Sequence, residues 1–315
     1  MTPWIDGLPP AATARVQRQR ASGTAGSLLS VPAAAGVRAA GLAPAGEVFG
    51  CYVVNLGWSG GFCDGYGLGQ GGLTSYQTPV VSSDSTNRFA NGFGPFARAV
   101  ETAWQGALDR LLAEARALGA DGVVGIRTSR RHVDGNAYEF SALGTAVRVL
   151  DAAAAPELSG RQGVWSAGLS GEDCAAAILS GFAPRGIAFG LTVATKHEDW
   201  ALRQQRNSWQ NTEVTGLTEL LQRARLGARR RLATSAAKIA KHGDLVVTEA
   251  RVQQFDTACN QELDLNAEAT FVGTVLIEIP GRARGAGPRP VPVLALSDGG
   301  LRPAQSRTST RRAPR

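Results

Sequence analysis

The 315-residue chain has few of the residues from which most catalytic and metal sites are built. It contains four cysteines, three histidines and one methionine. The cysteines, Cys51, Cys63, Cys174 and Cys259, are far apart and show no paired spacing. This pattern does not indicate a secreted disulfide scaffold, so a reducing cytoplasm is the expected location. The chain also lacks any run of about 18 apolar residues, so no transmembrane segment is expected.

Residues 1–280 have no net positive charge, and the excess of basic residues lies at the end of the chain. The net charge is +7, and residues 281–315 alone hold eight arginines against one aspartate. This Pro/Gly/Ser/Thr-rich tail has too little apolar surface to order itself and is predicted to be disordered. It is either an electrostatic arm for nucleic acid or an anionic surface, or a solvated tail of an arginine-rich chain.

A recurring segment indicates that one domain has been duplicated. Gly41-Leu42-Ala43-Pro44-Ala45-Gly46-Glu47-Val48-Phe49-Gly50 returns as Gly181-Phe182-Ala183-Pro184-Arg185-Gly186-Ile187-Ala188-Phe189-Gly190. Two later landmarks recur in the same order. Asp121-Gly122-Val123-Val124 matches Asp244-Leu245-Val246-Val247, and Gly144-Thr145 matches Gly273-Thr274. The chain should therefore be read as two versions of one unit.

The same order of elements is predicted in both copies. A short helix capped by Ser30 or Ser170 precedes a strand, a long amphipathic helix and two further strands. This gives an α+β fold in which a three-stranded sheet is packed by the long helix. The predicted organisation is a disordered leader (1–27), a first domain (28–151), a linker (152–162), a second domain (163–280) and the tail (281–315).

The copies differ most after their first strand, where the first copy has an insertion at about residues 57–94. Its spacing Gly67-Leu68-Gly69-Gln70-Gly71-Gly72 fits a dinucleotide fingerprint. No helix start follows it, which that chemistry requires. The glycine-rich part, 57–72, is therefore read as a flexible loop or as a contact surface for a ligand or partner.

A family resemblance rests on motifs of the first copy. The turn and strand Gly119-Ala120-Asp121-Gly122-Val123-Val124-Gly125-Ile126-Arg127, followed by Gly144-Thr145-Ala146-Val147, resembles the YbjQ-type family, labelled as a heavy-metal-binding domain. The second copy retains part of the pattern and resembles a diverged member. The resemblance implies tandem β-α-β-β, dodecin-like units. It also implies a homo-oligomer, as a pentameric or pseudo-decameric ring.

The family label invites a search for metal ligands. A structural zinc site needs four Cys or His ligands at short paired spacings, and the chain has none. Cys63 and Asp64, with Cys51, form the one candidate site for a divalent metal. A second candidate, for anions, is the basic cluster Arg127, Arg130, Arg131 and His132 at a strand end. A solvated strand end explains that cluster equally simply.

These observations favour a non-enzymatic protein. No serine-elbow motif or assignable pair of catalytic carboxylates occurs. The duplication and the open sheet edges predict an oligomeric, ring-forming scaffold or binding protein of unknown ligand. A heavy-metal sensor or carrier is the alternative.

Overall fold

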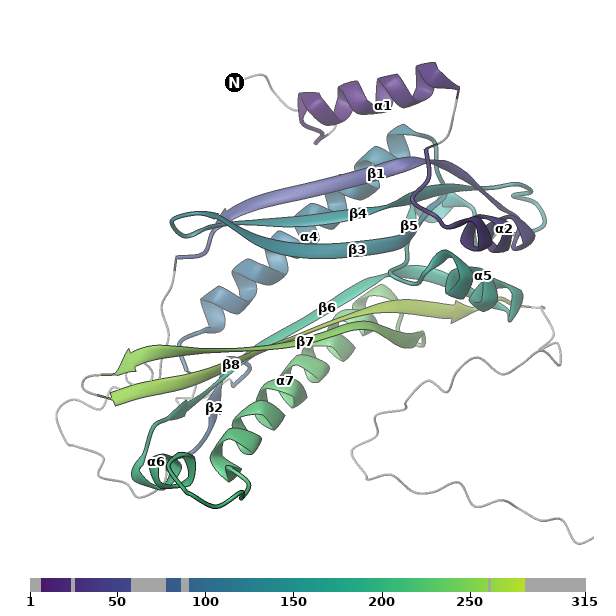
Figure 1. The fold of residues 1–315 in the computed structure, drawn as a ribbon. Coiled ribbons are helices and arrows are strands. Elements are labelled where there is room, and N and C mark those ends of the chain that lie inside the picture. The colour runs from purple at the N-terminus through teal and green to yellow at the C-terminus, as the bar shows by residue number, and fades with distance from the viewer. Residues whose placement is uncertain (1–6, 24–25, 58–77, 86–90, 260–261, 281–315) are drawn as a thin grey trace, which may run out of the picture.

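Figure 1 shows the fold in the computed structural model of the chain. It describes residues 7–23, 26–57, 78–85, 91–259 and 262–280. Cys63, Asp64, the glycine-rich stretch 58–72 and the tail from 281 on lie outside the described residues. No helix among the described residues is long and apolar enough to cross a membrane.

The two predicted copies contain corresponding elements. The first comprises α2 (Val31–Ala39), β1 (Leu42–Asn55), α4 (Gly94–Ala117), β3 (Gly122–Asp134) and β4 (Ala137–Val149). The second comprises α5 (Gly171–Leu179), β6 (Phe182–His197), α7 (Thr215–Ile239), β7 (Asp244–Cys259) and β8 (Glu262–Glu278). The additional elements are α1 (Pro10–Ser22), β2 (Val81–Ser82), a 3-10 turn (Gly160–Gln162), β5 (Trp165–Ser166) and α6 (Trp200–Arg206).

The α+β class is confirmed, and each sheet has the same antiparallel core. The strand orders are β1-β4-β3-β5 and β2-β6-β8-β7. Both first strands shift register at the repeated proline and glycine, between Pro44 and Gly46 and between Pro184 and Gly186. Each sheet therefore has the three expected long strands and one additional two-residue strand that the sequence did not indicate.

The long helices pack at one repeated glycine. A Cβ on Gly50 would collide with the backbone of α4 at Ala107, and a Cβ on Gly190 with the backbone of α7 at Ala228. Glycine therefore lets each helix lie directly against its first strand. The repeated segment thus marks the same helix-on-strand contact in both copies.

The second sheet is covered on both faces. Along β6, Phe189 and Leu191 pack in one core with α4, whereas Ala188 and Ala194 pack in another core with α7. Successive strand residues point to opposite faces, which explains this split. Helix α4 thus lies between the two sheets and α7 on the outside, as Figure 1 shows. An uncovered face was expected for an isolated unit, and here the other unit fills it.

The two copies exchange segments at their sheet edges. Part of the first copy's insertion forms β2, which pairs antiparallel with β6 through Val81↔Thr195 and Ser82↔Ala194. In the opposite direction, β5 lies at the start of the second copy and pairs parallel with β3 of the first sheet. The amide of Gly125 continues that pairing by donating to the carbonyl oxygen of Leu169 at 2.9 Å.

The short helices begin as predicted and pack against each other. The Ser30 hydroxyl accepts a hydrogen bond from the Ala33 amide at 3.1 Å, and Ser170 accepts one from Asp173 at 3.0 Å. Gly36 lies against Ala175. These caps satisfy amide groups that the first turn of a helix leaves open.

The leader, expected to be disordered, contains α1. Pro10 opens this helix at a position where its missing amide costs nothing. Arg15 and Gln19 donate hydrogen bonds to the carbonyl oxygens of Phe49 and Glu47 on the outer edge of β1. The helix is thus held by polar contacts with a strand edge, which its weak apolar periodicity does not reveal.

Candidate functional site

Of the three predicted metal ligands, only Cys51 lies among the described residues. Cys51 is a half-buried free cysteine on β1. Burial, and next the nearby carboxylate of Glu139, raise the pKa of its thiol. The thiol is therefore protonated at neutral pH and a poor metal ligand as it stands. Cys63 and Asp64 lie outside the described residues, so a site that includes them stays a prediction.

The basic cluster at the end of β3 is partly committed to ion pairs. Arg130 donates to Glu268 at 2.8 Å, which links the first sheet to the second. Arg131 pairs with Glu139 at 2.9 Å, and a ring nitrogen of His132 lies 2.7 Å from the carbonyl oxygen of Gly135. Arg127 is exposed. Anion binding at this strand end stays a prediction, as does nucleic-acid binding by the tail.

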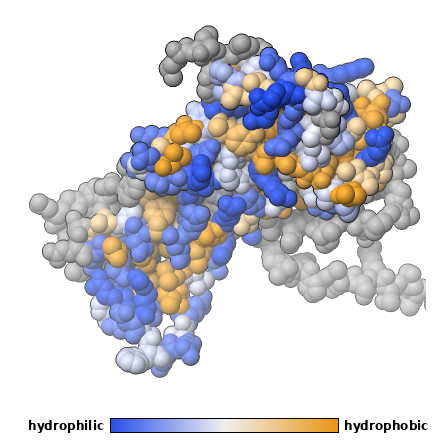
Figure 2. All heavy atoms as spheres, turned by 45° about the horizontal axis from the view of Figure 1, so that its top comes forward, coloured by the Kyte–Doolittle hydropathy of each residue, from blue (hydrophilic) through white to orange (hydrophobic). Residues whose placement is uncertain are grey.

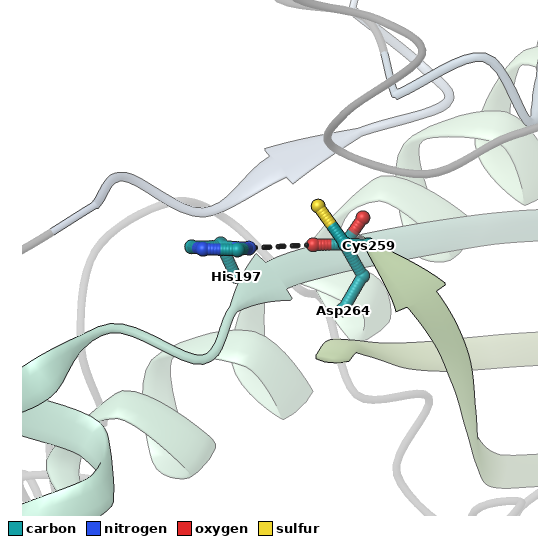
Figure 3. Close-up of side chains that lie close together, drawn as sticks. All are labelled: His197, Cys259 and Asp264. Carbon is teal, nitrogen blue, oxygen red and sulfur yellow. Dashed lines mark hydrogen bonds and ion pairs between the residues drawn. The ribbon is translucent and has the colours of Figure 1, made fainter. Parts of the chain in front are cut away.

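A different cluster forms where β6 and β7 end and β8 begins. The register of the second sheet places His197 of β6 opposite Asp264 of β8, and Cys259 of β7 opposite Glu262. Potential ligand atoms of His197, Cys259 and Asp264 lie within 4.8 Å of one another. Figure 3 shows these three side chains pointing toward a common point. All three are buried.

Two carboxylates hold the imidazole of His197. Nδ1 lies 3.0 Å from Asp264 and Nε2 lies 2.7 Å from Glu262. The hydrogen bond to Asp264, more than that to Glu262, raises the pKa of His197, while burial opposes the shift. Both ring nitrogens thus face carboxylate oxygens, an arrangement that favours the protonated imidazole when no other cation is present. A metal ion would have to displace the proton on Nδ1.

Cys259 completes the cluster but is disulfide-bonded. Cys259 is only 2% exposed to solvent. No sequence motif indicated this grouping, because the histidine is far in sequence from the cysteine and the aspartate. Only the pairing register of β6 with β8 brings them together.

A polar cavity of about 370 Å³ lies where α6 and α7 meet the insertion. Lys196 and Asp199 on its wall form a buried ion pair of 2.8 Å. Burial works against ionisation of Asp199, but hydrogen bonds from Lys196, Thr78 and Leu202 outweigh it and lower the pKa of Asp199. Because Lys196 also donates to Thr78, this pair anchors the insertion to the second copy.

Comparison with known proteins gives one family match and one curated relative. A Mycobacterium tuberculosis protein named as an encapsulin nanocompartment protein is 35% identical over 134 residues, which are 42% of this chain and 51% of that protein. The chain thus spans about half the length of this curated relative. No solved structure matches the chain. The predicted family resemblance is confirmed over part of the chain: residues 78–150 match the YbjQ family, described as "Putative heavy-metal-binding".

Proposed function

We propose that this chain is a non-enzymatic assembly protein that associates with further copies of itself through the outer edge of β7. One observation carries the proposal. Over its 16 residues β7 is the outermost strand of its sheet, and among the described residues no strand pairs with its outer side. A long open edge presents unpaired amide and carbonyl groups that another strand can satisfy.

The other sheet edges are each covered over part of their length, whereas β7 has no partner on its outer side among the described residues. Strand β2 pairs with β6, and β5 pairs with the first part of β3. On β1, the buried carboxylate of Glu114 accepts the Phe49 amide at 2.8 Å, and α1 bonds two carbonyl groups. The contrast favours β7 as the association edge. On the face drawn in Figure 2, hydrophobic side chains lie in separate clusters among hydrophilic ones. Such a surface favours association through a strand edge over association through one apolar patch.

The edge is also self-complementary in charge. Glu249 and Arg251 lie two residues apart, and within one chain Arg251 Nε is 2.6 Å from a Glu249 carboxylate oxygen. If two β7 strands pair antiparallel about a two-fold axis at Ala250, Glu249 of each faces Arg251 of the other. A two-fold interface uses the same patch on both copies, and opposite charges across strands stabilise pairing.

The relative's name supports assembly, since that protein is named as part of a nanocompartment. A ring of five chains, or a pseudo-decameric ring, stays a prediction for this chain.

Light scattering on the full chain tests the proposal. The wild type should form a defined oligomer at micromolar concentration. Glu249→Arg alone and Arg251→Glu alone should each weaken association by about tenfold or more, because like charges then face each other. The double variant restores opposite charges and should restore the assembly. A wild-type monomer would overturn the function, whereas an oligomer insensitive to all three variants would move the interface elsewhere.

We further propose metal binding as a second candidate function, favoured by the cluster of His197, Cys259 and Asp264. A nitrogen, a sulfur and a carboxylate oxygen are ligands that Zn²⁺ accepts. Glu262 on Nε2 would orient the imidazole, as carboxylates do behind zinc-bound histidines. The family description is consistent with this role.

Titration calorimetry with Zn²⁺ in reducing buffer tests the second candidate. The wild type should bind one ion per chain, and Asp264→Asn should abolish that binding. His132→Gln, which changes an exposed histidine, is the matched control and should bind like the wild type. Equal binding by the Asp264 variant would exclude the cluster as the site.

A further inference from the structure

The state of the Cys259 sulfur distinguishes two forms of the cluster. In the structure Cys259 is disulfide-bonded, so its sulfur carries no thiolate charge. The thiolate is the form of cysteine that binds metals. Without that thiolate, the potential metal ligands are His197 and Asp264. Glu262 is already hydrogen-bonded to His197 and paired with Arg203 at 3.3 Å.

We infer that reduction of the Cys259 disulfide switches the cluster from a low-affinity to a high-affinity site for a borderline-soft divalent cation such as Zn²⁺. The inference rests on the second function proposed above and adds its regulation. The reduced form offers the Sγ of Cys259, Nδ1 of His197 and a carboxylate oxygen of Asp264. Three protein ligands and a water complete the four-coordinate shell that zinc prefers.

The arrangement of carboxylates suits the reduced form. Glu262 lies 2.7 Å from Nε2 and keeps the proton on that nitrogen, so Nδ1 becomes available when its own proton leaves. Such an outer partner fixes the ring and raises its basicity as a ligand. Asp264, 1% exposed, is placed to bind from the opposite strand without a change of register.

The chemistry of the switch is a thiol–disulfide exchange. A thiolate of a dithiol reductant attacks one sulfur of the protein disulfide, the S–S bond breaks, and a mixed disulfide forms. The second thiol of the reductant displaces the protein sulfur and closes an oxidised cyclic disulfide. Two electrons pass to the protein, and both of its half-cystines end as thiols. Metal binding then releases the protons of the Cys259 thiol and of Nδ1.

Other described cysteines cannot substitute for Cys259. Cys174 is buried in α5, and burial raises its pKa to about 12. Cys51 is on β1 of the other sheet. Neither belongs to the cluster of potential ligands. Cys51→Ser is therefore a matched control that removes a thiol without touching the site.

The test measures Zn²⁺ affinity of the full chain by competition with a chromophoric chelator, before and after treatment with a phosphine reductant. Reduction should raise the affinity of the wild type and of Cys51→Ser by more than about a hundredfold, since losing an orienting partner alone costs about 10- to 100-fold. Cys259→Ser should stay in the weak state with or without reductant. Circular dichroism reports whether it folds.

A second readout avoids dependence on that variant. Co²⁺ added to the reduced wild type should give a thiolate-to-metal charge-transfer band, which is absent before reduction. Equal Zn²⁺ affinity in both states, or a reduced complex without this band, would overturn the switch and leave metal binding itself intact. No Zn²⁺ binding in either state would overturn the second proposed function as well.

Discussion

At the scale of single residues, Glu114 is a buried carboxylate that serves the edge of β1. It is fully buried on α4, accepts the Phe49 amide and pairs with Arg15. Burial is the largest influence and raises the pKa of Glu114, although the Phe49 amide and Arg15 act in the opposite direction. Ionised Glu114 is therefore less favourable in the folded chain than in the unfolded chain.

The stability of the wild type relative to Glu114→Gln should consequently depend on pH. Because the pKa of Glu114 in the folded chain is higher than its ordinary value of 4.5, the protonated carboxyl group stabilises the folded state. This stabilisation is complete at pH values below 4.5 and is lost as the pH rises through the pKa of the folded state. Urea unfolding between mildly acidic and neutral pH should show the wild type losing stability relative to the variant as pH rises. Glu213→Gln, on an exposed loop, should show no such trend. The opposite slope would contradict the assignment.

The candidate cluster could not be predicted from the sequence. His197 and Asp264 meet because strands β6 and β8 pair in one particular register. A shift by one residue would send one of them to the other face of the sheet. Composition and spacing carry no information on that register, and the disulfide at Cys259 was likewise not foreseen.

At the scale of elements, the repeated glycine controls how each long helix meets its sheet. Gly190 is on β6 with no room for a Cβ against α7. Overpacking of this kind is destabilising because backbone must move.

Gly190→Ala should therefore lower the free energy of unfolding by about 1–3 kcal/mol, measured by denaturant titration. Gly57→Ala is the matched control, since a Cβ there would meet nothing within 4 Å. Its change should be within about 0.5 kcal/mol. Equal effects at both positions would show that the helix contact does not set the cost.

Local patterns were sufficient to predict the principal elements. The spacing of apolar residues predicted both long helices. Asp134-Gly135-Asn136 is typical of a tight hairpin turn, and it joins β3 to β4, with Gly135 at a φ of 52°. Strands β2 and β5 were not predicted, because two residues carry no periodicity. Their pairing partners lie on the other copy, and only the packed molecule decides them.

At the scale of the whole molecule, Trp104 joins the two copies into one core. Its ring meets Phe140 of the first sheet edge-on at 5.0 Å and stacks on Phe189 of the second sheet at 5.8 Å. The indole is thus packed by both sheets at once, and both should unfold together.

Trp104→Ala should cost about 3–5 kcal/mol and lower the stability of both copies in a single transition. Trp209→Ala, at a fully exposed residue, should change the free energy of unfolding by less than about 0.5 kcal/mol. Denaturant unfolding followed by circular dichroism checks both variants. Two separate transitions in the wild type would contradict a shared core.

The exchange of β2 and β5 also bears on how far the chain can be shortened. Each half completes the other's sheet, so a truncation that removed either half would strip a strand from the survivor. Neither half can therefore be excised without leaving a new unpaired edge on the half that remains.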